Sequence, residues 1–139
     1  ADSLVAKFIE IRDYFLELNP DMLWFCENGT GTLLWDRSVA ETLYPRVTLS
    51  YCQYNGPGYR KNTTIATNAP WTPKPKCDPK TCKQVRDGRH LLSAQQGPEK
   101  INGKRAALDK CSRDTLHKIP DELCEEIYKV CANSQWVDV

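Results

Sequence analysis

The stretch that decides the fold runs from Val47 to Cys77 and reads VTLSYCQYNGPGYRKNTTIATNAPWTPKPKC. Within and just before it, residues 46–51 and 62–67 are rich in β-branched and aromatic side chains, which predicts two short strands. Between them, residues 55–58 (Asn-Gly-Pro-Gly) predict a turn, because glycine tolerates a positive φ and proline fixes its own φ. Short strands separated by turns are typical of a small β module.

The segments on either side extend this prediction. Residues 32–35 (Thr-Leu-Leu-Trp) are a further candidate strand. Prolines alternate with lysines in residues 72–76, so the backbone of residues 72–82 is expected to form a stiff, extended junction. Residues 93–104 are rich in polar side chains and predict a loop.

The clearest helix in the sequence covers residues 3–18. Apolar side chains recur there at spacings of four and three, and the dipeptide Asn19-Pro20 ends the pattern. We expect this apolar stripe to dock on the rest of the protein; the alternative is an amphipathic helix offered to the groove of a partner. The stripe consists of Leu4, Phe8, Ile11, Phe15 and Leu18.

A second, shorter helix is predicted at residues 120–131. Pro120 suits the first helical position, and the acidic residues that follow it complement the positive end of the helix dipole. Cys124 and Cys131 lie on one face of this helix, about 10 Å apart, which is too far for a disulfide between them.

Composition narrows the function class. The chain has 139 residues and a net charge of +1, which allows one domain or two small modules and gives no argument for a generic nucleic-acid binder. It contains seven cysteines and two glycosylation sequons, at Asn28 and Asn62, so we predict a secreted, disulfide-bonded glycoprotein. No apolar run is long enough to span a membrane.

Neither a metal site nor an active site is predicted. The only closely spaced cysteine pair is Cys77-x4-Cys82, and His90 and His117 stand in no recognisable zinc pattern, so we interpret the cysteines as disulfides and expect no cofactor. A hydrolase is the less favoured alternative, and it would need His90 or His117 beside Asp, Ser or Cys in a cleft.

A basic segment offers another kind of function. Its prolines hold positive side chains on an extended backbone, which suits a sulfated polysaccharide or an acidic protein face. The charges belong to Lys74, Lys76, Lys80, Lys83, Arg86 and Arg89.

The Val47–Cys77 stretch resembles the second half of a complement control protein (sushi) module. That family runs from a strand ending in Tyr-Cys, through a Gly-Tyr turn, to a Trp followed by prolines and a final Cys. Here these elements are Tyr51-Cys52, Gly58-Tyr59, Trp71 and Cys77. The resemblance implies a Cys52–Cys77 disulfide with Trp71 packed beside it. The family's third cysteine is absent near Thr67, so Cys26 lacks its usual partner.

The C-terminal stretch resembles the same family more distantly. Cys131 is followed at Trp136 by the tryptophan that such a module carries, which implies a Cys82–Cys131 bond; Cys124 is then an extra cysteine available to Cys111. The resemblance implies a small, disulfide-rich, mainly β protein of two divergent modules with a helix at each end. The implied divisions are residues 1–22 for the N-terminal helix, 23–81 for the first module and 82–139 for the second.

Divergent modules of this kind are similar to immunomodulators secreted by intestinal nematode parasites. The resemblance implies a non-enzymatic protein that binds a host immune receptor or cytokine, with the interleukin-33 receptor as the first partner, and blocks signalling by occlusion. Exposed aromatic and arginine side chains anchor such interfaces, so the partner-binding candidates are Trp24, Tyr44, Tyr54, Tyr59 and Arg60.

A second family offers a rival interpretation. Trp35-Asp36, Cys52, Arg60 and Trp71 also resemble the hormone-binding ectodomain of peptide-hormone receptors, which follows an N-terminal helix. That resemblance implies a ligand-binding ectodomain. A glycosaminoglycan-binding module built on the basic segment is a further alternative.

Overall fold

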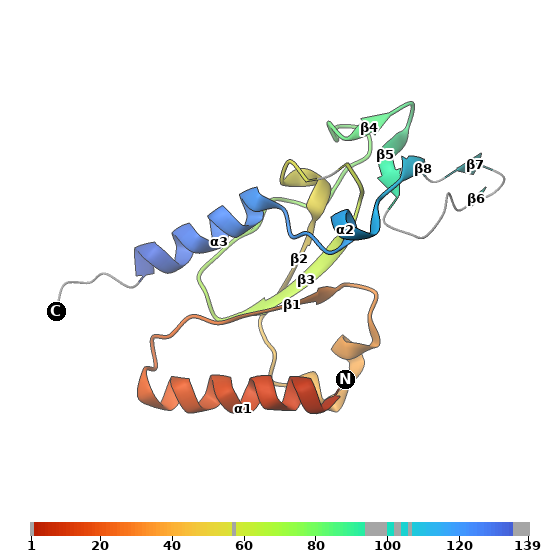
Figure 1. Ribbon diagram of the computed structural model, residues 1–139. Helices are drawn as coiled ribbons and strands as arrows, with labels where there is room; N and C mark the ends of the chain where they lie inside the picture. Colours follow the sequence, from red (N-terminus) through yellow and green to blue (C-terminus); the bar gives the residue numbers. More distant parts are fainter. Residues whose placement is uncertain (1, 57, 94–99, 102–103, 106, 135–139) are drawn as a thin grey trace.

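The computed structural model describes residues 2–56, 58–93, 100–101, 104–105 and 107–134 (Figure 1). It is a mixed α and β structure, in which two long helices lie on opposite sides of a small sheet. The helices are α1 (Asp2–Leu18), α2 (Arg113–Leu116) and α3 (Asp121–Ser134), and short 3-10 turns occupy η1 (Leu33–Asp36), η2 (Ser38–Ala40) and η3 (Tyr51–Gln53). The strands are β1 (Phe25–Gly29), β2 (Arg46–Ser50), β3 (Asn62–Thr67), β4 (Val85–Arg86), β5 (Arg89–Ser93), β6 (Lys100–Ile101), β7 (Lys104–Arg105) and β8 (Ala107–Lys110).

The central sheet has three antiparallel strands in the order β1-β3-β2. Strand β3 lies in the middle, where its sequence Asn-Thr-Thr-Ile-Ala-Thr supplies the β-branched residues that a sheet interior favours. Successive side chains of a strand point to opposite faces, so Ile65 and Ala66 belong to different layers. Both residues are buried, which shows that the sheet is covered on both sides.

One core lies between the sheet and α1. Its buried members come from the segment before β1, from the turn region before β2 and from β3, and they are Trp24, Ala40, Leu43 and Ala66. Side chains from the inner face of α1 pack against them, namely Val5, Phe8, Ile9 and Leu16.

The other core lies on the opposite face of the sheet, where α3 covers it. Its buried members are Leu49, Tyr51, Tyr54, Tyr59, Ile65 and Leu123. Leu123 belongs to α3, and Leu92 of β5 packs against the same core. The two predicted modules therefore contribute to one continuous core, and a bridge between Tyr59 and Leu92 also joins them.

Two smaller sheets follow the first in sequence. Strands β4 and β5 form an antiparallel pair, β8 adds to β5 in parallel, and β6 pairs with β7. Gly58 lies just before Tyr59, the residue that bridges to β5. Its φ is 88°, a left-handed conformation that glycine adopts without a steric penalty. Asn55 also has a positive φ, as expected for the predicted turn.

The structure corrects the predicted fold class, because the protein is mixed and not mainly β. The predicted helices at both ends and the strands at residues 46–51 and 62–67 are confirmed. The predicted strand at residues 32–35 is wrong, since most of this segment forms the 3-10 turn η1. Most of the predicted loop at residues 93–104 lies outside the described residues, and so does Trp136.

No helix in the described part of the chain combines the length and apolarity needed to cross a bilayer.

Replacing Leu123 by alanine should lower the free energy of unfolding by about 2–5 kcal/mol, because the side chain is fully buried and its removal leaves a cavity. Urea denaturation measures the loss. Tyr128→Ala is the matched control, since it shortens an exposed side chain of the same helix and should change the value by no more than about 0.5 kcal/mol. Equal effects of the two substitutions would contradict the packing of α3 in the core.

Candidate functional site

The N-terminal helix is apolar on two faces. Its inner face packs on the sheet through Val5, Phe8, Ile9 and Leu16. Its outer face carries five large apolar side chains that are between 48% and 76% exposed. These outer residues are Leu4, Ile11, Tyr14, Phe15 and Leu18.

The orientation of α1 corrects the predicted docking of its apolar stripe. Of the five stripe residues, only Phe8 packs against the core. The other four face solvent because the helix turns a neighbouring strip, centred on Arg12, toward the sheet. The sequence periodicity identified the helix correctly, but it selected the outer face as the buried one.

Arg12 fixes this orientation. It is only 7% exposed, and its guanidinium donates hydrogen bonds to the carbonyl oxygen of Thr42 at 3.1 Å and to the Thr42 hydroxyl at 3.2 Å. The guanidinium carbon also lies 4.9 Å from the ring centroid of Trp24, within the range of a cation–π contact. A buried charge is stable only when its donors are satisfied, so these contacts hold one side of the helix against the protein.

A second candidate site lies at the end of β2, where η3 follows the strand. Cys52, Cys77, Cys82 and His90 are all buried, and their three sulfurs and one imidazole nitrogen lie within 4.8 Å of one another. The Nε2 atom of His90 is 3.3 Å from the sulfur of Cys77 and 3.7 Å from that of Cys82. The sequence reasoning missed this cluster, because its members come from segments that only the fold brings together.

Local structure positions each of these four residues. Cys52 lies in η3, directly after β2. The backbone N–H of Cys77 donates to the Ser50 hydroxyl at 3.0 Å, and that of Cys82 donates to the Asp78 carbonyl at 2.9 Å, which closes the turn between the two cysteines. His90 belongs to β5.

The electrostatics of the cluster do not suit a nucleophile. Burial raises the pKa of the Cys52 thiol to about 12 and also raises the pKa of Cys77. Burial, together with the nearby charge of Arg60, lowers the pKa of His90. A catalytic cysteine needs a lowered pKa and access to substrate. Cys52 and Cys77 have neither, although His90 does lie beside cysteines as the hydrolase alternative required. His117 is exposed at the end of α2.

The predicted partner-binding residues separate into two groups. Trp24, Tyr54 and Tyr59 are buried in the two cores, which corrects their assignment to a binding surface. The Tyr59 hydroxyl donates to the carbonyl oxygen of Thr115 at 3.1 Å. Tyr44 and Arg60 are exposed.

The remaining cysteines lie apart from the cluster. Cys26 is half-buried on β1, Cys111 packs at the edge of the core, and Cys124 and Cys131 lie on α3. No sulfur–sulfur bond is formed by any of the seven cysteines in the structure. Trp71 does not belong to the cluster: it packs on the ring of Phe25, and its Nε1 donates to Glu126 at 2.7 Å.

Both sequon asparagines lie on the central sheet. Asn28 of β1 is opposite Thr64 of the second sequon, so the two acceptor segments are neighbours on paired strands. Both asparagine side chains are half-buried. The Asn62 Oδ1 accepts a hydrogen bond from Ser50 at 2.7 Å.

The basic segment is mostly open to solvent. Lys74 differs from the rest, because its ammonium pairs with Glu122 of α3 and donates to the Gln53 carbonyl at 3.2 Å. Arg89 is half-buried. The exposed charges are those of Lys76, Lys80, Lys83 and Arg86.

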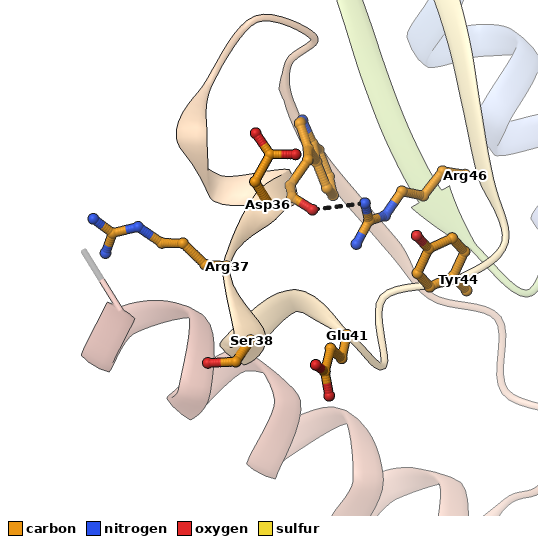
Figure 2. A pocket seen from close by; sticks show the side chains of 7 residues that line it. Asp36, Arg37, Ser38, Glu41, Tyr44 and Arg46 are labelled. Atoms are coloured by element: carbon orange, nitrogen blue, oxygen red, sulfur yellow. Dashed lines mark hydrogen bonds between the residues drawn. The ribbon is translucent and has the colours of Figure 1, made fainter.

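A surface pocket of about 270 Å³ lies beside α1, between η1, η2 and β2 (Figure 2). One of its two arginines, Arg46, donates to the carbonyl oxygens of Trp35, Ala40 and Leu43 at 2.8–2.9 Å. The guanidinium also lies over the ring of Tyr44, with 4.1 Å to the centroid. Arg46 is thus occupied in holding the turns together, and we interpret the pocket as a structural feature.

Comparison with protein-family models, with curated proteins and with solved structures found no match to this chain. The resemblance to complement control modules therefore stays a prediction.

Replacing Arg12 by alanine should loosen α1, because Thr42 loses two charge-assisted hydrogen bonds and Trp24 loses the cation over its ring. We expect the opening free energy of α1, measured by amide hydrogen exchange, to fall by about 2–3 kcal/mol. Arg37→Ala is the control, because the partly exposed pair of Arg37 with Asp2 should contribute less than about 1 kcal/mol. Unchanged exchange in Arg12→Ala would show that another contact orients the helix.

Proposed function

We propose that this protein is an extracellular binding protein that blocks an immune receptor or cytokine by covering its interaction surface. The outer face of α1 is the binding surface. The observation that carries the proposal is the outward orientation of the apolar stripe on a helix whose other face is firmly packed.

The outer face has the composition of an interaction surface. Single exposed apolar side chains are ordinary, but a contiguous set on one helix face indicates a docking site. It includes Tyr14 and Phe15, whose rings pack edge to face with centroids 5.4 Å apart. Aromatic side chains are enriched among the residues that dominate binding energy.

Charge defines the chemistry of the partner. Glu10, Asp13 and Glu17 are exposed along one side of the stripe, and Lys7 and Arg12 are the only basic residues of α1. The complementary surface is an apolar groove with a basic rim, into which α1 inserts its outer face. Because the sheet holds the inner face, the helix is ordered before binding and loses little conformational entropy when it docks.

The sequence resemblance supplies the first partner to test. Because the sequence resembles secreted complement-control-like immunomodulators, the interleukin-33 receptor is the leading candidate. The cysteine content supports secretion, and so do the two sequons on neighbouring strands. The same proposal includes glycosylation of Asn28 and Asn62.

The triple variant Leu4→Gln, Ile11→Gln and Phe15→Gln should bind the receptor ectodomain at least about 100-fold more weakly, because a combined loss of about 3 kcal/mol from the three anchors corresponds to that factor. Glutamine preserves helix propensity and replaces only the apolar contact. Biolayer interferometry with the immobilised ectodomain measures the affinity, and circular dichroism checks that the helix is intact.

The control is a double variant, Leu33→Gln and Tyr128→Gln, which removes exposed apolar side chains from η1 and α3. It should bind like the unmodified protein. Equal weakening by both variants would contradict the assignment of α1 as the binding surface. Failure of the unmodified protein to bind the ectodomain at micromolar concentration would reject the interleukin-33 receptor as the partner.

The basic segment supports a second candidate, binding of sulfated polysaccharide. Lys76, Lys80 and Lys83 are exposed, and in the described part of the chain they take part in no ion pair. Their triple replacement by glutamine should move elution from a heparin column to lower salt, since the attraction is electrostatic. The charge-matched control replaces Lys7, Lys118 and Lys129 instead. Identical elution of the two variants would count against a site on the basic segment.

A further inference from the structure

We propose that Cys52, Cys77, Cys82 and His90 form a structural zinc site with three thiolate ligands and one imidazole ligand. This inference is independent of the proposed binding function. It rests on the convergence of four ligand atoms from three separate segments of the chain.

The spacing of the ligand atoms fits a tetrahedral zinc ion. With Zn–S bonds of about 2.3 Å and Zn–N bonds of about 2.0–2.1 Å, the edge from sulfur to nitrogen of a tetrahedron is about 3.6 Å. The observed distances from His90 Nε2 to the sulfurs of Cys77 and Cys82, 3.3 and 3.7 Å, bracket this value. All four atoms lie within 4.8 Å of one another, so one ion between them contacts every ligand after only a small contraction.

A disulfide explains less of the same cluster. The Cys52–Cys77 bond implied by the family resemblance uses two sulfurs and leaves the Cys82 thiol and the His90 imidazole buried beside it without a role. A zinc ion uses all four groups. It also accounts for the odd number of cysteines, since three of the seven bind metal and an even number is left.

The surroundings of the cluster suit bound thiolates. The side-chain amide of Gln53 donates toward the sulfur of Cys82 at 3.5 Å and toward that of Cys52 at 3.8 Å. Such hydrogen bonds to ligand sulfurs orient them and tune a metal site. Three thiolates and one zinc ion carry a net charge of −1. Arg60 is the nearby positive charge, and it partly offsets this −1.

Four protein ligands in a buried position are typical of a structural zinc site, because a catalytic site keeps one position open for water or substrate. Zinc binding displaces the protons of the three thiols to solvent, and the ion then joins η3, the turn at residues 77–82 and β5. The metal therefore ties the end of the first sheet to the second sheet. A donor set of thiolates and imidazole selects zinc among the abundant divalent ions.

The test uses the full chain secreted from eukaryotic cells and purified without chelator or reductant. We expect one zinc per chain by elemental mass spectrometry. Exchange for Co²⁺ should produce the thiolate-to-cobalt charge-transfer absorption and the intense visible bands of tetrahedral cobalt. Cys82→Ser and His90→Gln should each lose zinc or bind it at least 10-fold more weakly, whereas the matched controls Cys26→Ser and His117→Gln should retain it.

Thermal unfolding gives a second measurement, which needs no variant of a zinc ligand. A strong zinc chelator should lower the melting temperature of the unmodified protein and of both controls, and added zinc should restore it. A non-reducing peptide map that links Cys52 to Cys77 in the secreted protein would overturn the proposal. Absence of zinc together with a cobalt spectrum that lacks thiolate bands, or full zinc retention in Cys82→Ser and His90→Gln, would overturn it as well.

Discussion

Strand β3 is buried on both of its faces, and the rest of the structure depends on this constraint. Ile65 faces the core that α3 covers, whereas Ala66 faces the core that α1 covers. Strand β3 pairs with β1 along one edge and with β2 along the other. Because neither face can be left in water, a helix must dock on each side, and the chain supplies one from each terminus.

The sequence predicted the elements better than their contacts. Residues 62–67 carry a local β signal, and α1 carries a local helical period, so both were found. The orientation of α1 was predicted wrongly because apolar residues surround most of the helix, and periodicity alone cannot rank two apolar faces. The deciding contact, Arg12 with Thr42, joins residues 30 positions apart, and a buried arginine is rarely predicted from a pattern.

The cysteine–histidine cluster illustrates the same limit. The pair Cys77 and Cys82 was visible in the sequence, but Cys52 lies 25 positions before Cys77 in the chain and His90 follows eight positions after Cys82. Zinc patterns are recognised by two close pairs of ligands, and here only one pair is close. The fold brings the distant ligands together: the turn η3 after β2 positions Cys52, and the bridge between Tyr59 and β5 positions His90.

The two candidate sites place different demands on the same scaffold. The α1 face needs a rigid inner surface, which the sheet and Arg12 provide, and it lies on the side of the sheet opposite α3. The cluster lies where the polypeptide leaves β2. The segments that meet there contribute few large apolar side chains, because the small core at this point consists of three cysteines with Val85 packed against them. Strands β4 and β5 are short and bury little apolar surface of their own, so a cross-link at that point would add stability. Burial of all four side chains limits the access of oxidants to the thiols, and a zinc–thiolate centre there is therefore compatible with an extracellular protein.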